Sequence, residues 1–106
     1  METAEKKITF SEMINSDKPV LVDFYADWCG PCKVMAPKLV ELSSKVKGKA
    51  TVIKIDVDKN QSVANHYQIR SIPTLVLFKN GSELWRQSGV VPVEYLEQLI
   101  NKFGNQ

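Results

Sequence analysis

The sequence has few residues that commonly ligate metal, because its 106 residues include only two cysteines and one histidine. Tetrahedral zinc needs four ligands, so we expect no metal site. No apolar run approaches the roughly 20 residues that cross a bilayer, so we expect no membrane association. Lysine and arginine total 14 against 12 aspartates and glutamates, without a basic cluster, so the charge gives no reason to expect nucleic acid as a partner.

The first seven residues are polar and lack the apolar stretch of a signal peptide. We therefore expect a cytoplasmic protein. In that compartment a structural disulfide is unusual, whereas a catalytic one is not. The length predicts one domain over residues 1–106 with a single core, and we expect a monomer.

The two cysteines lie three residues apart in the stretch Trp28-Cys29-Gly30-Pro31-Cys32. An apolar run typical of a buried strand precedes this stretch, and a helical pattern follows it. Residues three apart on the first turn of a helix have Cα atoms roughly 5 Å apart, which a disulfide accepts. The loop that such a bond closes is short and stabilises the fold little. We therefore expect a disulfide that is made and broken in use.

The position of the pair assigns a role to each sulfur. A helix N-terminus offers unpaired N–H groups and a partial positive charge, which stabilise a thiolate at Cys29. Gly30 allows a tight start to the helix, and Pro31 suits its first position. We expect Cys29 to attack a partner disulfide, and Cys32, one turn into the helix, to resolve the mixed disulfide.

Strand and helix patterns alternate along the chain and predict an α/β sandwich with a mixed sheet. A capping box at Thr9 and Glu12 precedes a short helix over about 11–15. Asn80-Gly81 is a strong hairpin signal between the last two strands. The expected strands are 8–10, 20–26, 50–57, 75–78 and 83–87; the other expected helices are 33–47, 60–67 and one opened by Pro92.

Asp23 is the one charged residue inside the apolar run 20–26. Strand alternation places it on the same face as Leu21 and Tyr25. A lone carboxylate inside a buried strand is energetically expensive, so a functional role is a better explanation than a structural one.

With these residues in view, the chain resembles the thioredoxin family over essentially its whole length. The resemblance depends on residues 22–33, with Trp-Cys-Gly-Pro-Cys at their centre, and on Ala36-Pro37. It also depends on Ile55-Asp56-Val57-Asp58, on Ile72-Pro73-Thr74, on residues 78–81 and on Gly89 before the last helix.

The resemblance implies a thioredoxin fold, a central five-stranded mixed sheet flanked by four helices in three layers. It implies a cis peptide bond before Pro73, close to the two cysteines, and Asp23 buried behind Cys32 as its proton acceptor. Lys54 matches the lysine that tunes this aspartate. The implied docking surface for clients consists of Trp28, Gly30, Pro31, Ile72, Pro73 and Gly89.

The resemblance also implies a protein-disulfide reductase that contributes to cell redox homeostasis and that an NADPH-dependent thioredoxin reductase recharges. Family clients include ribonucleotide reductase, peroxiredoxin and methionine sulfoxide reductase. No nucleotide motif is present, so we expect no cofactor beyond the Cys29–Cys32 disulfide. Two alternatives stand beside this function. One is a scaffold subunit of a larger complex, and the other is an oxidase or isomerase, which Gly-Pro between the cysteines disfavours.

Overall fold

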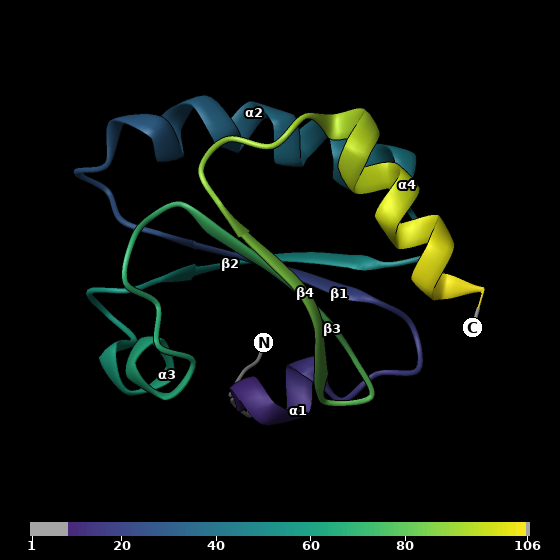
Figure 1. Ribbon diagram of the computed structural model, residues 1–106, viewed down its shortest axis with the longest axis horizontal. Coiled ribbons are helices and arrows are strands. Elements are labelled where there is room, and N and C mark those ends of the chain that lie inside the picture. The colour runs from purple at the N-terminus through teal and green to yellow at the C-terminus, as the bar shows by residue number, and fades with distance from the viewer. Residues whose placement is uncertain (1–8, 106) are drawn as a thin grey trace, which may run out of the picture.

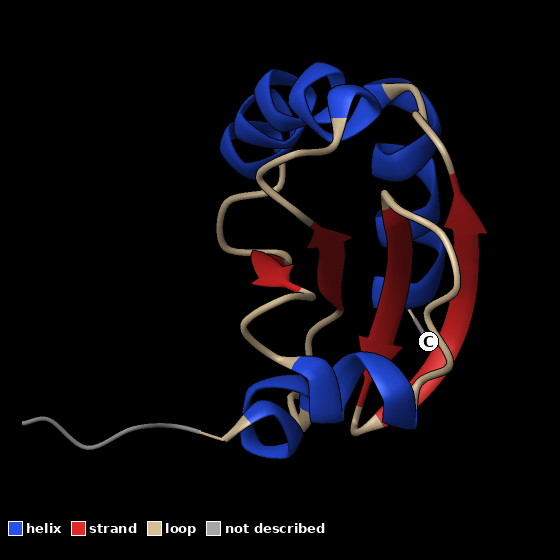
Figure 2. Ribbon diagram, turned by 90° about the vertical axis from the view of Figure 1, so that its left-hand side faces the viewer, coloured by secondary structure: helices blue, strands red, loops and turns tan. Residues whose placement is uncertain are grey.

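The structure is a computed structural model that describes residues 9–105, drawn in Figure 1. One mixed sheet lies between two layers of helices. Helices α2 and α4 cover one face of the sheet, and α1 and α3 lie against the other (Figures 1 and 2). The elements are α1 (Phe10–Ile14), β1 (Val20–Tyr25), α2 (Gly30–Lys45), β2 (Thr51–Asp56), α3 (Gln61–His66), β3 (Thr74–Lys79), β4 (Ser82–Ser88) and α4 (Val93–Gly104).

The sheet has four strands within residues 9–105, in the order β2-β1-β3-β4. Strands β1 and β2 are parallel, whereas β3 is antiparallel to both β1 and β4. The predicted fold is confirmed, but the expected first strand is not seen: Thr9 caps α1 and Phe10 is its first residue. The predicted capping box explains this difference, because the Thr9 side chain accepts the N–H of Glu12 and fixes the start of the helix there. Ile8 lies outside the described residues.

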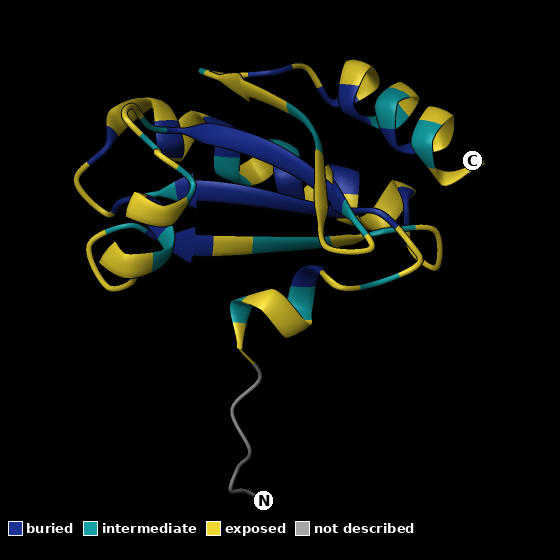
Figure 3. Cartoon of the chain, turned by 60° about the horizontal axis from the view of Figure 1, so that its bottom comes forward, coloured by how far each residue is buried: buried dark blue, intermediate teal, exposed yellow. Residues whose placement is uncertain are grey.

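Strand β1 is buried on both faces, which explains its almost unbroken apolar run. Leu21 packs into the core under α2 and α4. Val20, Val22 and Phe24 alternate with it and pack into the core toward α1 and α3. Figure 3 shows the two central strands buried along their length, with exposed residues on the outer strands.

The turn between β3 and β4 forms where the sequence predicts it. Asn80 and Gly81 have φ values of 53° and 81°, the left-handed conformation that a two-residue hairpin turn requires. The backbone N–H groups of both residues donate to carbonyl oxygens near the end of α1, at Ser16 and Ile14. These two hydrogen bonds therefore hold the hairpin against the end of α1.

Helix α2 begins three residues earlier than the predicted range and runs through Pro37. Its first turn contains the Gly-Pro pair, and Cys29 stands at its N-cap. The helix that Pro92 was expected to open is confirmed as α4, and its Val93, Leu96 and Ile100 are buried against α2 and the sheet. The long helix that begins at the cysteines thus packs on one side of the sheet with α4 beside it.

Candidate active site

Cys29 and Cys32 form a disulfide at the N-terminus of α2, with their Cα atoms 5.3 Å apart. Each residue is only 4% exposed. The sulfur of Cys29 accepts the backbone N–H of Cys32 at a distance of 3.2 Å. When the bond is reduced, this N–H and the positive end of the helix stabilise negative charge on the Cys29 sulfur.

The loop before β3 lies directly against the disulfide. The Cys29 sulfur is 3.7 Å from the carbonyl oxygen of Ile72, and the Ile72–Pro73 peptide bond is cis. The carbonyl oxygen of Pro73 accepts the N–H of Gly89 at 2.8 Å. The segment at Ile72 and Pro73 thus lies between the disulfide and the loop that follows β4.

Trp28 stands at the edge of this site with 71% of its surface exposed. Its indole N–H donates to a carboxylate oxygen of Asp58 at 2.8 Å. A hollow of about 150 Å³ opens beside the indole. Its lining residues are Trp28, Val57, Ile69, Arg70, Ser71 and Ile72. The hydrogen bond to Asp58 thus holds the exposed indole in one orientation beside the disulfide.

The sequence analysis did not identify Asp58 as a residue of the site. Asp56 holds the turn that contains it: Oδ1 of Asp56 accepts the N–H groups of Asp58 at 2.8 Å and Lys59 at 3.2 Å. The Asp-x-Asp spacing after a strand is typical of such a turn. It does not indicate that the second carboxylate reaches an indole thirty residues away.

Asp23 is fully buried, and neither of its carboxylate oxygens has a hydrogen-bond partner among residues 9–105. It follows Leu21 on the face that α2 covers, so its carboxylate and Cys32 lie on the same side of the sheet. Burial raises the pKa of Asp23 to about 6, and the positive charge of Lys54 acts in the opposite direction. A carboxylate with this pKa is suited to accept a proton near neutral pH.

Lys54 is the register partner of Asp23 across the β1–β2 pair. Its ammonium lies over the ring of Tyr25, 4.4 Å from the centroid. A cavity of about 110 Å³ adjoins these side chains and reaches Cys32. Its lining residues are Tyr25, Ala26, Asp27, Cys32, Lys33, Ala36 and Lys54. Cys32 therefore borders a cavity that the charged residues Asp27, Lys33 and Lys54 also line.

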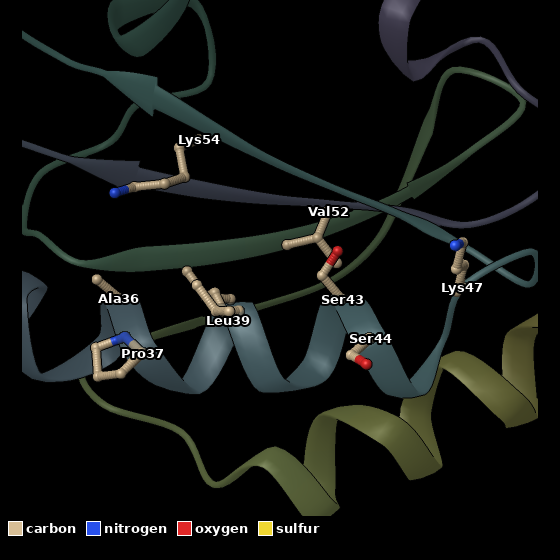
Figure 4. A pocket seen from close by; sticks show the side chains of 9 residues that line it. Ala36, Pro37, Leu39, Ser43, Ser44, Lys47, Val52 and Lys54 are labelled. Atoms are coloured by element: carbon tan, nitrogen blue, oxygen red, sulfur yellow. The ribbon is translucent and has the colours of Figure 1, made fainter.

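A wider groove of about 710 Å³ lies away from the disulfide, between α2 and β2 (Figure 4). Pro37 and Leu39 form part of its apolar lining, and Lys47 and Lys54 supply its charges. It contains no cysteine and no carboxylate. The groove therefore offers none of the groups that thiol chemistry needs.

The thioredoxin family model matches residues 2–102. The chain is 47% identical over 104 residues to a thioredoxin-like protein of Synechocystis sp., a match that covers 97% of this chain and 99% of that protein. The chain belongs to the thioredoxin family. It is also 50% identical over 99 residues to the chloroplastic thioredoxin Y of Oryza sativa subsp. japonica, covering 90% of this chain but only 59% of the rice protein.

Solved thioredoxins have the same fold. A mutant thioredoxin from Halobacterium salinarum superposes with a TM-score of 0.79 at 40% identity, over 91% of this chain and 86% of that one. The thioredoxin of Malassezia sympodialis gives a TM-score of 0.81 at 35% identity, over 90% of this chain and 83% of that one. With its redox-active pair in place, the chain is a thiol–disulfide oxidoreductase of this family.

Among residues 9–105, no group of three or more histidines, cysteines, aspartates or glutamates is arranged to hold a metal ion. None of the helices there is both long and apolar enough to span a bilayer.

Proposed function

We propose that this thioredoxin-family chain reduces protein disulfides, with Cys29 as the attacking residue and Cys32 as the resolving one. The placement of the Cys29 sulfur supports this assignment most directly. It lies at the N-cap of α2, receives the Cys32 N–H and faces the Ile72 carbonyl oxygen. Cys32 lies one turn into the helix, on the side of the sheet where Asp23 is buried.

In the first step the Cys29 thiolate attacks one sulfur of the client disulfide. A bond forms between Cys29 and that sulfur, the client's own S–S bond breaks, and its second sulfur leaves as a thiolate. The Ile72 carbonyl oxygen beside Cys29 is an acceptor for an N–H of an extended client segment. Trp28 and Ile72 line one hollow, and Gly89 is hydrogen-bonded to the neighbouring Pro73.

In the second step the thiol of Cys32 gives its proton to Asp23, and the resulting thiolate attacks the Cys29 sulfur. The Cys29–Cys32 disulfide forms, the mixed disulfide breaks, and the client leaves with both sulfurs reduced. Two electrons have passed to the client. Asp23 is suited to this proton because its pKa, raised to about 6 by burial, lies close to neutral pH.

The oxidised chain needs two electrons to begin again. Family membership implies a thioredoxin reductase as the donor and disulfide-bearing proteins as clients in general. Ribonucleotide reductase, peroxiredoxin and methionine sulfoxide reductase are the clients we propose, with no cofactor beyond the disulfide. A cytoplasmic location stays a prediction, since the relatives include both bacterial and chloroplastic thioredoxins.

Reduction of a small disulfide-bonded protein, with dithiothreitol as electron source, tests this proposal. The native chain should accelerate the reaction, and Cys29→Ser should abolish the acceleration. Reduced Cys32→Ser, mixed with the client in the absence of dithiothreitol, should accumulate a covalent complex that added dithiothreitol then releases. Absence of catalysis by the native chain would favour the scaffold role, and faster oxidation than reduction of the client would favour an oxidase.

A further inference from the structure

The loop between β4 and α4 is fixed at two points, one on each side of Val90. The N–H of Gly89 donates to the carbonyl oxygen of Pro73 at 2.8 Å. The N–H of Val91 donates to the thioether sulfur of Met35 at 3.5 Å. Val90 itself is 40% exposed. The loop therefore presents an apolar side chain to solvent from a backbone that is held at both ends.

The bond to Met35 is buried. Met35 and Val91 are both 0% exposed, and no other acceptor for the Val91 N–H is present among residues 9–105. A thioether is a weak acceptor, but a buried N–H without any acceptor costs about 1–3 kcal/mol. Leucine at position 35 would fill the same space and offer no acceptor. The Met35 sulfur thus provides an acceptor for a buried N–H, which an apolar side chain of the same volume would not provide.

Met35 also connects the loop to the reactive helix. It follows Cys32 by three residues, so the two side chains lie one turn apart on neighbouring positions of α2. Figure 1 shows the segment between β4 and α4 passing next to α2. Through this sulfur, the position of the loop depends on the helix that carries the disulfide.

We propose that Met35 is a positioning residue for client binding: its sulfur holds the Val91 backbone so that Val90 is presented as an apolar contact beside the disulfide. This inference rests on the proposed reductase function and deepens it. The matching client is an extended segment with an apolar side chain near its reactive cysteine, because Val90 offers dispersion and burial but no charge. Nothing in the sequence pattern around Met35 indicates this bond.

The test compares Met35→Leu with a matched control, Met13→Leu, which is partly buried in the core on the opposite face of the sheet. Met35→Leu should speed hydrogen exchange of the Val91 amide about tenfold and raise KM for a protein client about fivefold, as loss of one modest hydrogen bond implies. It should leave kcat, and the rate with the small substrate hydroxyethyl disulfide, unchanged. Met13→Leu should change none of these quantities.

A second variant, Val90→Ser, removes the apolar contact and keeps the sulfur bond. It should raise KM for the protein client similarly while leaving Val91 exchange at the native rate. An unchanged KM in both variants, or equal losses with the protein client and with hydroxyethyl disulfide, would overturn the positioning role. In either case the native chain would still reduce both substrates, whereas failure of the native chain with both would overturn the proposed function itself.

Discussion

The indole N–H of Trp28 donates to the carboxylate of Asp58 at 2.8 Å, across thirty residues of sequence. Trp28 is the most exposed large apolar side chain at the site, at 71%. An unrestrained tryptophan with that exposure would adopt several rotamers, so binding a client would cost the entropy of fixing it. The carboxylate fixes the ring beforehand, and the turn held by Asp56 fixes the carboxylate.

Asp58→Ala should therefore raise KM for a protein client about threefold, by releasing the indole, with little effect on kcat. Asp58→Asn keeps an acceptor oxygen and should stay close to the native value. In a Trp85→Phe background, the fluorescence anisotropy of Trp28 should fall in the alanine variant. Asp17→Ala, another exposed aspartate, is the control. An unchanged anisotropy would show that the hydrogen bond does not restrain the ring.

Asp23 should make the protein less stable as pH rises. Its ordinary pKa is 3.8, and burial raises it to about 6 in the folded protein. The folded state therefore binds this proton more tightly, and its stabilising effect, fully present below pH 3.8, is lost as pH rises through 6. A gap of about two pH units corresponds to about 3 kcal/mol at neutral pH.

We expect Asp23→Ala to raise the free energy of unfolding at pH 7.5 by about 2 kcal/mol, since the small cavity offsets part of the gain. At pH 3.5 the variant should show no gain. The same variant should slow turnover at pH 7 at least about tenfold, because the Cys32 proton loses its acceptor. Urea unfolding midpoints at the two pH values check the first claim. A midpoint at pH 7.5 that stays the same or falls would contradict the burial argument.

Lys54→Gln should move the pKa of Asp23 further upward, because the positive charge that opposes the effect of burial is removed. The ¹³C shift of the Asp23 carboxyl, followed through a pH titration, measures this directly. The free energy of unfolding of this variant should then continue to decrease up to a higher pH than that of the native chain. Lys49→Gln, in the exposed turn before β2, is the control and should leave the titration unaltered. A downward movement in Lys54→Gln would contradict the assigned role.

Gly89→Ala and Gly30→Ala form a matched pair, because a Cβ added at either position meets no atom within 4 Å. Gly89 has φ of +92°, a conformation that alanine adopts at a cost of about 1 kcal/mol. Gly30 lies in the first turn of α2, where alanine stabilises by about 0.5–1 kcal/mol through the unfolded chain. The midpoint temperature of thermal unfolding should therefore fall in Gly89→Ala and rise in Gly30→Ala. Shifts of the same sign would contradict this account.

The fold was predictable from the sequence because its strongest signals are local. The capping box at Thr9, the Asn80-Gly81 turn and the stripe of α4 each depend on residues within one or two turns of each other. The expected first strand did not appear at Thr9 and Phe10, since the cap signal outweighed the apolar pattern.

The site was predictable only in part, because only some of its features depend on residues that are close together in the sequence. The two cysteines and the buried Asp23 are each conspicuous within a short window of sequence. The bonds from Trp28 to Asp58 and from Val91 to Met35 join side chains and backbone that only the folded topology brings together. Neither aspartate nor methionine differs in type from ordinary surface or core residues, so composition and spacing give no signal for them.

Mapping the alkylation of the fully reduced chain tests the central claim most directly. After a brief exposure to iodoacetamide at neutral pH, peptide mass analysis should find Cys29 modified at least about tenfold faster than Cys32, because the helix N-terminus and the Cys32 N–H stabilise its thiolate. In Cys29→Ser, modification of Cys32 should remain slow. Equal modification of the two sulfurs, or faster modification of Cys32, would contradict the assignment of Cys29 as the attacking residue.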